Sequence, residues 1–179
     1  MLMKYRRGVY VGKFQPFHKG HLKCIQYALS KVDELIILVG SAQLSHTFNN
    51  PFTAGERIEM IRRALKDENI KSDRYLIIPV EDTFGVHSIW VSKVTSILPK
   101  FEVVFTNEPL TRRLFLEAGF KVESIPLYRR KLYSATEVRR RIIEGEDWAS
   151  LVPSAVHSYI ISIGGDERLR DLLRSDKEN

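Results

Sequence analysis

The chain has 179 residues, a length that predicts one domain, residues 1–179, with a sizeable buried core. Its 44% hydrophobic and 28% charged residues are typical of a globular protein in water, and no apolar run is long enough to span a bilayer. The single cysteine, Cys24, excludes an internal disulfide, and the net charge of +6 favours an anionic partner. Residues 1–7 lack the apolar core of a secretion signal, so we expect a cytoplasmic protein.

The first predicted strand, residues 8–11, is followed by a turn at residues 12–21 and by a helix over residues 19–32. The first turn of a helix presents unpaired N–H groups and the positive end of the helix dipole, which together favour an anion. His18 and His21 are three residues apart, so they lie on one side of that turn, where an imidazole can donate to a phosphate oxygen. We interpret the stretch as a phosphate site. A metal pair and two surface residues are the alternatives.

A continuous apolar run at residues 35–40 predicts a second strand that is covered on both faces. The polar loop that follows, residues 40–53, is long for a connection, and such loops are often functional or mobile. Thr53 and Glu56 fit a capping box that begins the next helix. Arg57, in its first turn, lies either near a ligand at the carboxyl edge of the sheet or on a solvated helix face.

Alternating strands and helices continue to about residue 126. We expect strands at residues 75–80, 101–106 and 120–125, the last of them an edge strand. We also expect a helix with Trp90, Val94 and Ile97 on one stripe and a second helix at residues 109–118. The pattern predicts an α/β, doubly wound, Rossmann-like sheet of five parallel strands (core residues 7–126), with helices on both faces. A C-terminal helical part at 133–174 follows, and residues 175–179 are expected to fray.

A second helix start with phosphate-binding chemistry occurs at residues 134–139. Ser134 and Glu137 fit a capping box, whereas Thr136 and Arg139 are not needed for that role and offer a hydroxyl and a guanidinium fork. Six basic residues lie between positions 129 and 141, against the single acid Glu137. Such a cluster suits phosphorylated ligands, and it also suits a nucleic acid.

Two motifs carry a family resemblance. Residues 18–21, His-Lys-Gly-His, match the His-x-Gly-His signature of the adenylyl- and cytidylyltransferase superfamily, and residues 134–139 match its Ser/Thr-x-Thr-x-x-Arg element. From about residue 8 to 168, with residues 12–18, 40–47 and 50–57 included, the chain resembles the nicotinamide-mononucleotide (NMN) adenylyltransferases of the archaeal type. The resemblance implies a nucleotidyltransferase of NAD biosynthesis, in which ATP and NMN give NAD and pyrophosphate.

The resemblance also implies roles for individual residues. His18 and His21 contact phosphates as charge develops, while Lys13 and Arg139 hold the β- and γ-phosphates. The implied nucleotide-site residues are Gly12, Phe14, Gln15, Gly20, Gly40, Ser134 and Thr136. The implied residues for the mononucleotide are Ser41, Asp82, Trp90 and Arg57. Trp90 is equally well explained as a core residue of its helix stripe.

The chain departs from the family pattern at Lys13, Ala135, His87 and Asn49, where the family has arginine, glycine, asparagine and, in some members, a basic residue. Mg²⁺ bound mainly by the triphosphate and water is expected, since no metal site made by the protein is recognisable. The resemblance suggests a homo-oligomer, a hexamer, with no membrane or nucleic-acid partner. Another enzyme of the superfamily, such as a pantetheine-phosphate adenylyltransferase, and a nucleic-acid-binding protein are the rival interpretations.

Overall fold

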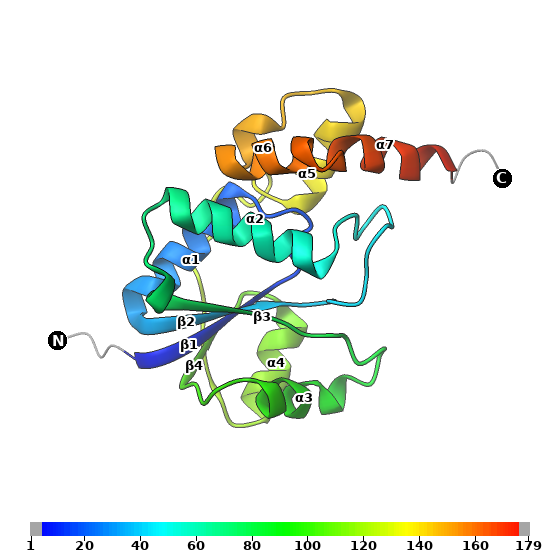
Figure 1. The fold of residues 1–179 in the computed structure, drawn as a ribbon. Coiled ribbons are helices and arrows are strands. Elements are labelled where there is room, and N and C mark those ends of the chain that lie inside the picture. The colour runs from blue at the N-terminus through cyan, green and yellow to red at the C-terminus, as the bar shows by residue number, and fades with distance from the viewer. Residues whose placement is uncertain (1–4, 176–179) are drawn as a thin grey trace. The chain divides into compact units, whose positions relative to one another are not determined.

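The computed structural model describes residues 5–175, which divide into two compact units that alternate along the chain (Figure 1). The sheet unit comprises residues 5–12, 24–42 and 71–126, and the helical unit comprises residues 13–23, 43–70 and 127–175. None of the helices in this part of the chain is long and apolar enough to cross a membrane. The single-domain organisation stays a prediction.

The sheet unit is built on five parallel strands in the order β3-β2-β1-β4-β5. The strands are β1 (Tyr5–Gly12), β2 (Val32–Val39), β3 (Tyr75–Pro79), β4 (Val103–Phe105) and β5 (Lys121–Glu123). The chain adds β2 and β3 on one side of β1 and then β4 and β5 on the other, which is the doubly wound order. The predicted fold class is confirmed, and the expected strand at residues 120–125 is an edge strand, although a shorter one.

Helices cover both faces of this sheet because side chains alternate along each strand. On one face the buried strand residues Val9 and Ile36 pack with Val94 of α3 (Trp90–Ile97) and Phe115 of α4 (Pro109–Glu117). Figure 1 shows α3 and α4 on that side of the strands. On the other face Tyr10 contacts Cys24 of α1 (Lys19–Lys31) through a side-chain hydrogen bond.

The predicted stripe of α3 is partly wrong. Val91 and Val94 are buried within the helix and Leu98 follows at its end, whereas Ile97 is 46% exposed. Trp90 packs against the core but keeps part of its surface exposed. With 3.6 residues per turn, Val91, Val94 and Leu98 form the centre of the apolar stripe, whereas Ile97 lies at its margin.

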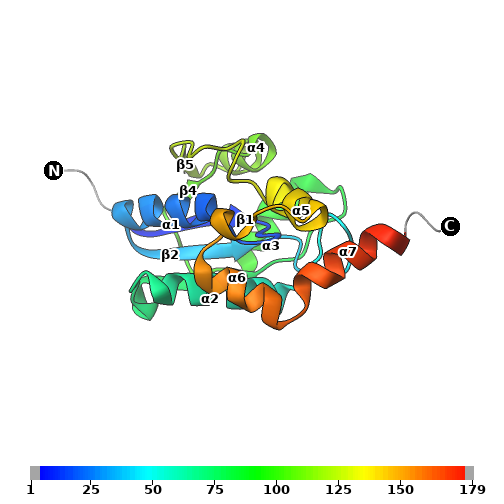
Figure 2. The same cartoon turned by 90° about the horizontal axis from the view of Figure 1, so that it is seen from above.

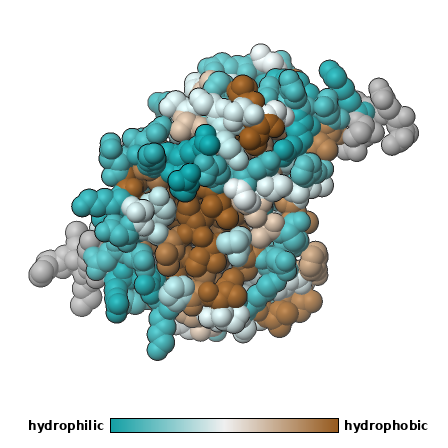
Figure 3. All heavy atoms as spheres, in the orientation of Figure 1, coloured by the Kyte–Doolittle hydropathy of each residue, from teal (hydrophilic) through white to brown (hydrophobic). Residues whose placement is uncertain are grey.

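The two edges of the sheet differ in chemistry. At β5, Tyr5 donates a 2.6 Å hydrogen bond to Glu123, and Lys121 lies over the Tyr5 ring. At β3 the strand Tyr75–Pro79 is apolar and only half-buried, and Figure 3 shows hydrophobic surface over it. Charges and a terminal proline are two of the features that keep edge strands from pairing with other chains.

The helical unit contains α2 (Ala54–Asp67), α5 (Ala135–Glu144), α6 (Ser154–Ser162) and α7 (Gly165–Ser175). Short 3₁₀ helices lie at Ser72–Arg74 and His87–Ile89 in the sheet unit and at Ala149–Leu151 in the helical unit. The capping box of α2 is confirmed, since Glu56 N–H donates to the Thr53 hydroxyl and Thr53 N–H donates to the Glu56 carboxylate. Figure 2 shows α6 running beside α2.

The end of the chain is tied back to the start of α2. Arg168 of α7 donates to both carboxylate oxygens of Glu56 at 2.8 Å and to the Pro51 carbonyl at 3.0 Å. Gly165 leaves no room for a side chain, because an added Cβ would lie 2.7 Å from the Phe52 ring. The predicted C-terminal helical part is therefore packed, and residues 176–179 of the predicted frayed end lie outside the described residues.

Candidate active site

The turn between β1 and α1 is an ordered loop with buried side chains. Phe14 and Phe17 are almost completely buried, and Phe14 has a left-handed backbone with φ 54°. Gln15 is 2% exposed, and its side-chain amide makes two hydrogen bonds with the backbone of Phe52. It donates to the Phe52 carbonyl at 2.8 Å and accepts from the Phe52 N–H at 2.9 Å. Gln15 therefore anchors the loop, and its predicted nucleotide contact stays a prediction.

His18 and His21 hold each other in place at the start of α1. The His18 N–H donates to His21 Nδ1 at 3.2 Å, the His21 N–H donates to His18 Nδ1 at 3.3 Å, and the rings stack with centroids 3.6 Å apart. A ring nitrogen that accepts a hydrogen bond carries no proton, so in a neutral imidazole the proton is on Nε2. Both rings are therefore preset as Nε2–H donors.

Both imidazoles are neutral near pH 7. Burial lowers the pKa of His18 to about 3, and burial followed by the neighbouring His18 ring lowers the pKa of His21 well below 6.5. His18 is 6% exposed, so the surface-residue alternative is wrong for it. The metal alternative finds no support, because within residues 5–175 no three His, Cys, Asp or Glu side chains gather as metal ligands.

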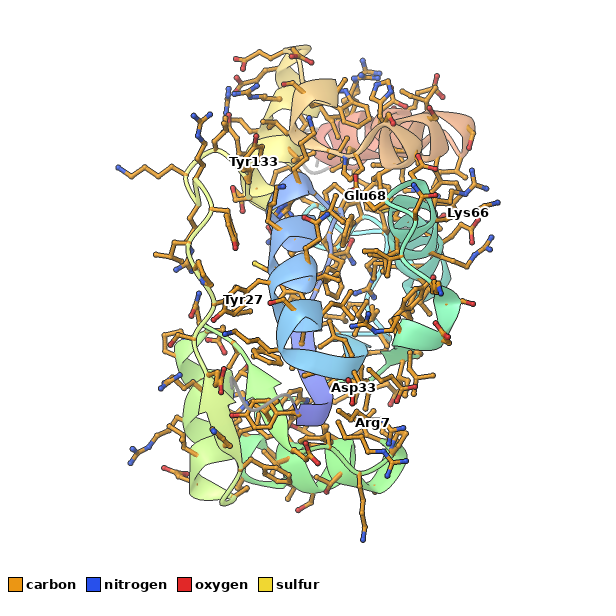
Figure 4. All side chains as sticks on the ribbon, turned by 90° about the vertical axis from the view of Figure 1, so that its left-hand side faces the viewer. Arg7, Tyr27, Asp33, Lys66, Glu68 and Tyr133 are labelled. Atoms are coloured by element: carbon orange, nitrogen blue, oxygen red, sulfur yellow. The ribbon has the colours of Figure 1, made fainter. Side chains whose placement is uncertain are left out.

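The start of α5 lies against the start of α1. A Cβ added to Gly20 would be 3.0 Å from the His18 ring and 3.0 Å from Tyr133 Cβ, and Figure 4 shows Tyr133 beside the first turn of α1. The glycine of the His-Lys-Gly-His motif thus permits the close approach of the two helix starts. The two motifs therefore lie side by side within the helical unit, and their joint binding of a polyphosphate stays a prediction.

The predicted capping box of α5 forms only in part. The Ser134 hydroxyl accepts from Glu137 N–H at 3.1 Å, as expected. The Glu137 carboxylate accepts from Arg140 and Arg141 at 2.8–2.9 Å, and these bonds take the place of the predicted return bond to the Ser134 backbone. Two guanidinium groups attract the carboxylate more strongly than one amide does. Thr136 is exposed at the same helix start.

Arg139 reaches from α5 to the histidine loop. It is 6% exposed, its Nη1 donates to the Gln15 carbonyl at 2.7 Å, and its Nη2 donates to the Thr136 hydroxyl at 3.4 Å. The Phe48 ring lies 5.8 Å from the guanidinium carbon, within cation–π range. Burial lowers the pKa of Arg139, but an arginine stays charged at neutral pH.

Arg57 is also inside the helical unit. Its exposed fraction is 0%, its Nη1 donates to the Lys13 carbonyl at 2.8 Å, and its Nε donates to the Thr53 carbonyl at 3.2 Å. The solvated-surface alternative for Arg57 is therefore wrong, and its predicted contact with the mononucleotide stays a prediction. Lys13 itself is exposed, and none of the ion pairs among residues 5–175 includes its ammonium.

The basic cluster at residues 129–141 is not one continuous patch. Arg139 is buried, while Arg140 and Arg141 form ion pairs with the carboxylates of Glu137, Glu144 and Glu146. These acids lie on the same helix or just after it. Arg129, Arg130 and Lys131 remain exposed. The pairing removes two of the charges on which the nucleic-acid interpretation depended.

The remaining candidate residues belong to the sheet unit. The Gly40 N–H donates to the Gly12 carbonyl at 2.9 Å where β1 and β2 end. Ser41 follows with 0% exposure and φ 50°, and Asp82 is half-buried. The rings of Trp90 and Phe115 make an edge-to-face contact with centroids 5.7 Å apart. This contact confirms the interpretation of Trp90 as a residue that packs on the core. A role of Ser41, Asp82 and Trp90 in binding the mononucleotide stays a prediction.

Four residues that support the site were missed. Phe52 receives the Gln15 clasp, Arg168 holds the start of α2, Tyr133 packs on Gly20, and Phe48 lies over Arg139. The aromatic character of Phe48 and Phe52 in a polar loop was the one signal in the sequence. Nothing local marks Arg168, whose partner Glu56 is 112 residues away.

This arrangement is suited to group transfer without a covalent intermediate. Neutral donors at one helix start and a buried guanidinium at its neighbour suit a polyphosphate, and neither histidine is poised as a nucleophile or base, since each Nδ1 is occupied by a backbone N–H. In a chain that also contains a doubly wound parallel sheet, these features indicate the class of α/β nucleotidyltransferases.

Comparisons with known proteins agree. The cytidylyltransferase-like family matches residues 9–141. The nicotinamide-nucleotide adenylyltransferase of Saccharolobus solfataricus is 53% identical over 171 residues, covering 96% of this chain and 99% of that protein. The enzyme of the same name from Archaeoglobus fulgidus is 50% identical, covering 95% of this chain and 99% of that protein. The chain therefore belongs to the cytidylyltransferase-like family and, within it, to the nicotinamide-nucleotide adenylyltransferases.

The fold likeness extends to more distant proteins. A crystal structure of a bifunctional NMN adenylyltransferase/ADP-ribose pyrophosphatase from Francisella tularensis, complexed with AMP and a manganese ion, superposes with a TM-score of 0.75 at 24% identity. The match covers 97% of this chain and 53% of that one, so this chain spans about half of the bifunctional protein. At this identity the likeness shows the fold alone.

Proposed function

We propose that this chain catalyses its family's reaction, ATP and NMN giving NAD and pyrophosphate, by presenting two neutral imidazoles and a buried guanidinium to the polyphosphate of ATP. The observation that carries the proposal is the reciprocal His18–His21 pair, fixed beside the α5 start that bears Arg139. In the reaction, an oxygen of the 5′-phosphate of NMN attacks the α-phosphorus in line. The bond between the α-phosphorus and the oxygen that bridges the α- and β-phosphates breaks, and its electron pair leaves with pyrophosphate.

Catalysis then consists of positioning and charge stabilisation. The Nε2–H groups of His18 and His21 donate to phosphate oxygens as negative charge develops on the bridging oxygen. Because both rings are neutral and each Nδ1 accepts a backbone N–H, the single ring proton is on Nε2, where it can be donated. The imidazoles act as fixed dipoles rather than as a general base.

The proposed polyphosphate contacts are those that the family resemblance implies. Lys13, exposed at the end of β1, and Arg139 are assigned to the β- and γ-phosphates, and the hydroxyls of Ser134 and Thr136 assist. The residues assigned to the rest of the nucleotide are Gly12, Phe14, Gln15, Gly20 and Gly40. The residues assigned to the mononucleotide are Ser41, Asp82 and Trp90.

Mg²⁺ enters this proposal as part of the substrate MgATP. Residues 5–175 offer no cluster of three or more metal-binding side chains, so the ion is held by triphosphate oxygens and water. A cytoplasmic location and a homo-oligomer, with the hexamer suggested by the family resemblance, complete the proposal.

The direct test is incubation of the full chain with ATP, Mg²⁺ and NMN, with chromatographic detection of NAD and an assay of pyrophosphate. Parallel reactions offer nicotinic acid mononucleotide and 4′-phosphopantetheine as acceptors. We expect NAD and pyrophosphate in equal amounts with NMN. Pyrophosphate release with phosphopantetheine alone would establish the rival superfamily enzyme. A salt-sensitive gel shift with DNA or RNA that nucleotide leaves unchanged would revive the nucleic-acid interpretation.

A further inference from the structure

We propose that Arg57 is a positioning residue, which fixes the Lys13 carbonyl oxygen and thereby presents the Lys13 ammonium to the ATP polyphosphate. The inference rests on the proposed function of Lys13. It replaces a direct contact between Arg57 and the mononucleotide with an indirect role in the nucleotide half of the reaction.

The first observation is complete burial of a guanidinium that binds backbone carbonyls. Arg57 is 0% exposed, and it donates to Lys13 at 2.8 Å and to Thr53 at 3.2 Å. A buried cation is costly unless it is well hydrogen-bonded, and carbonyl oxygens are suitable acceptors for it. A side chain with no exposed surface reaches a ligand only through the residues that it holds.

The second observation is the backbone that this contact stabilises. The peptide between Lys13 and Phe14 is planar, so fixing the Lys13 carbonyl also fixes the direction of the next N–H. Phe14 has φ 54°, a left-handed conformation that is strained for an aromatic residue and persists where the surroundings enforce it. Loss of the guanidinium releases one of the contacts that enforce it.

The third observation is that the segment from Lys13 to Gln15 is hydrogen-bonded at both of its ends. Arg57 binds the Lys13 carbonyl, and Arg139 binds the carbonyl of Gln15 two residues later at 2.7 Å. The Gln15 side chain is clasped by the backbone of Phe52, which lies just before α2. The exposed Lys13 side chain thus leaves from a rigid backbone, which reduces the entropy lost when it binds a phosphate.

A double-mutant cycle tests the inference on the full-length protein. The variants are Lys13→Ala, Arg57→Gln and the double variant, with Arg57→Lys as a charge-conserving version in case Arg57→Gln does not fold. Arg62→Gln is the matched control, since Arg62 is an exposed arginine on the same helix that pairs with Glu59. The measurements are kcat and KM for ATP and for NMN, and the thermal stabilisation produced by MgATP alone.

If Arg57 acts through Lys13, the two changes are not additive. We expect each single variant to lower kcat/KM for ATP by about tenfold or more, and the double variant to lose no more than the worse single one. KM for NMN should change less than about twofold, and Arg62→Gln should match the wild type. Arg57→Lys should lose MgATP stabilisation, because an ammonium cannot reproduce the planar fork.

If the fold-loss of kcat/KM for ATP in the double variant equals the product of the losses in the two single variants, the inference is overturned, because Arg57 then acts independently of Lys13. A rise confined to KM for NMN would also overturn it, in favour of direct contact with the mononucleotide. The MgATP stabilisation keeps this test separate from the proposed function. If the wild type forms no NAD, the proposed function fails, while the cycle is still completed from ATP binding.

Discussion

The two units bury different kinds of side chain. The sheet unit has an apolar core in which Val9, Ile36, Val94 and Phe115 pack together. The helical unit buries apolar residues too, but it also encloses Gln15, His18, Arg57 and Arg139, four of the six buried polar or charged residues among those described. The sheet unit is therefore stabilised mainly by the packing of apolar side chains, whereas the helical unit contains a polar network in which each group needs a particular hydrogen-bond partner.

The difference matters because the two kinds of core fail differently. An apolar side chain that is shortened costs free energy in proportion to the surface and cavity lost, while its neighbours keep their arrangement. A buried polar group that loses its partner leaves a donor or acceptor unsatisfied and frees the loop it held. Changes in the apolar core of the sheet unit should therefore lower stability, and changes in the helical network should lower the reaction rate.

The largest expected effect is on stability. Phe115→Ala removes a fully buried ring from the sheet core, and we expect the free energy of unfolding to fall by about 3–5 kcal/mol. Urea unfolding measures the loss, and kcat for NAD formation, expressed per folded molecule at low temperature, should stay within about twofold of the wild type. A tenfold fall in kcat without loss of stability would contradict the division between the units.

His21→Ala should show the opposite pattern. Loss of one fixed donor to developing charge lowers kcat by about 100- to 1000-fold. The thermal transition should move far less than in Phe115→Ala, because the change removes one weak backbone–imidazole hydrogen bond and a stacked ring. A near-normal kcat with an intact transition would exclude the phosphate role of this histidine.

Stability should also depend on pH through the helical network. The pKa of His18 is about 3 when folded, against 6.5 for the free side chain, so below pH 6.5 the unfolded chain takes up a proton that the folded chain does not. His18 alone then lowers the free energy of unfolding by about 2 kcal/mol between pH 7 and pH 5, and His21 adds to this fall. Urea unfolding of His18→Gln should show a smaller fall than the wild type. Equal slopes for His18→Gln and the wild type would refute the assignment.

The smallest effect compares two glycines of the helical unit. Gly20→Ala places a methyl group 3.0 Å from the His18 ring and from Tyr133 Cβ, and we expect kcat/KM for ATP to fall by about tenfold. Gly55→Ala, in the first turn of α2, meets only the Thr53 hydroxyl at 4.0 Å and should stabilise the chain by up to about 1 kcal/mol. An unchanged rate in Gly20→Ala would show that the starts of α1 and α5 are not tightly coupled, and a rate loss in Gly55→Ala would show that the first turn of α2 also affects the reaction.

Much of the fold was predictable because it is written in local patterns. Apolar runs located the five strands, and the helices that begin at Lys19, Ala54 and Pro109 were found from periodicity and helix-start signals. The two motifs at 18–21 and 134–139 indicated the candidate site, since a helix start favours an anion wherever the helix lies. The errors were local as well: Ile97 was placed inside and is exposed, and Glu137 pairs with arginines in place of completing a cap.

The partners of the buried polar groups were not predictable in this way. Helical periodicity distinguishes apolar from polar faces, but it does not indicate that the side chains of Arg57 and Arg139 are buried. Their partners are Lys13, 44 residues from Arg57, and Gln15, 124 residues from Arg139. A long-range hydrogen bond to a backbone carbonyl leaves no trace in residue type, because every residue carries that carbonyl. The amino-acid sequence was enough to establish the strands, the helix starts and the histidine pair. The tertiary structure alone determined which arginine side chains are buried and which carbonyl oxygens they bind.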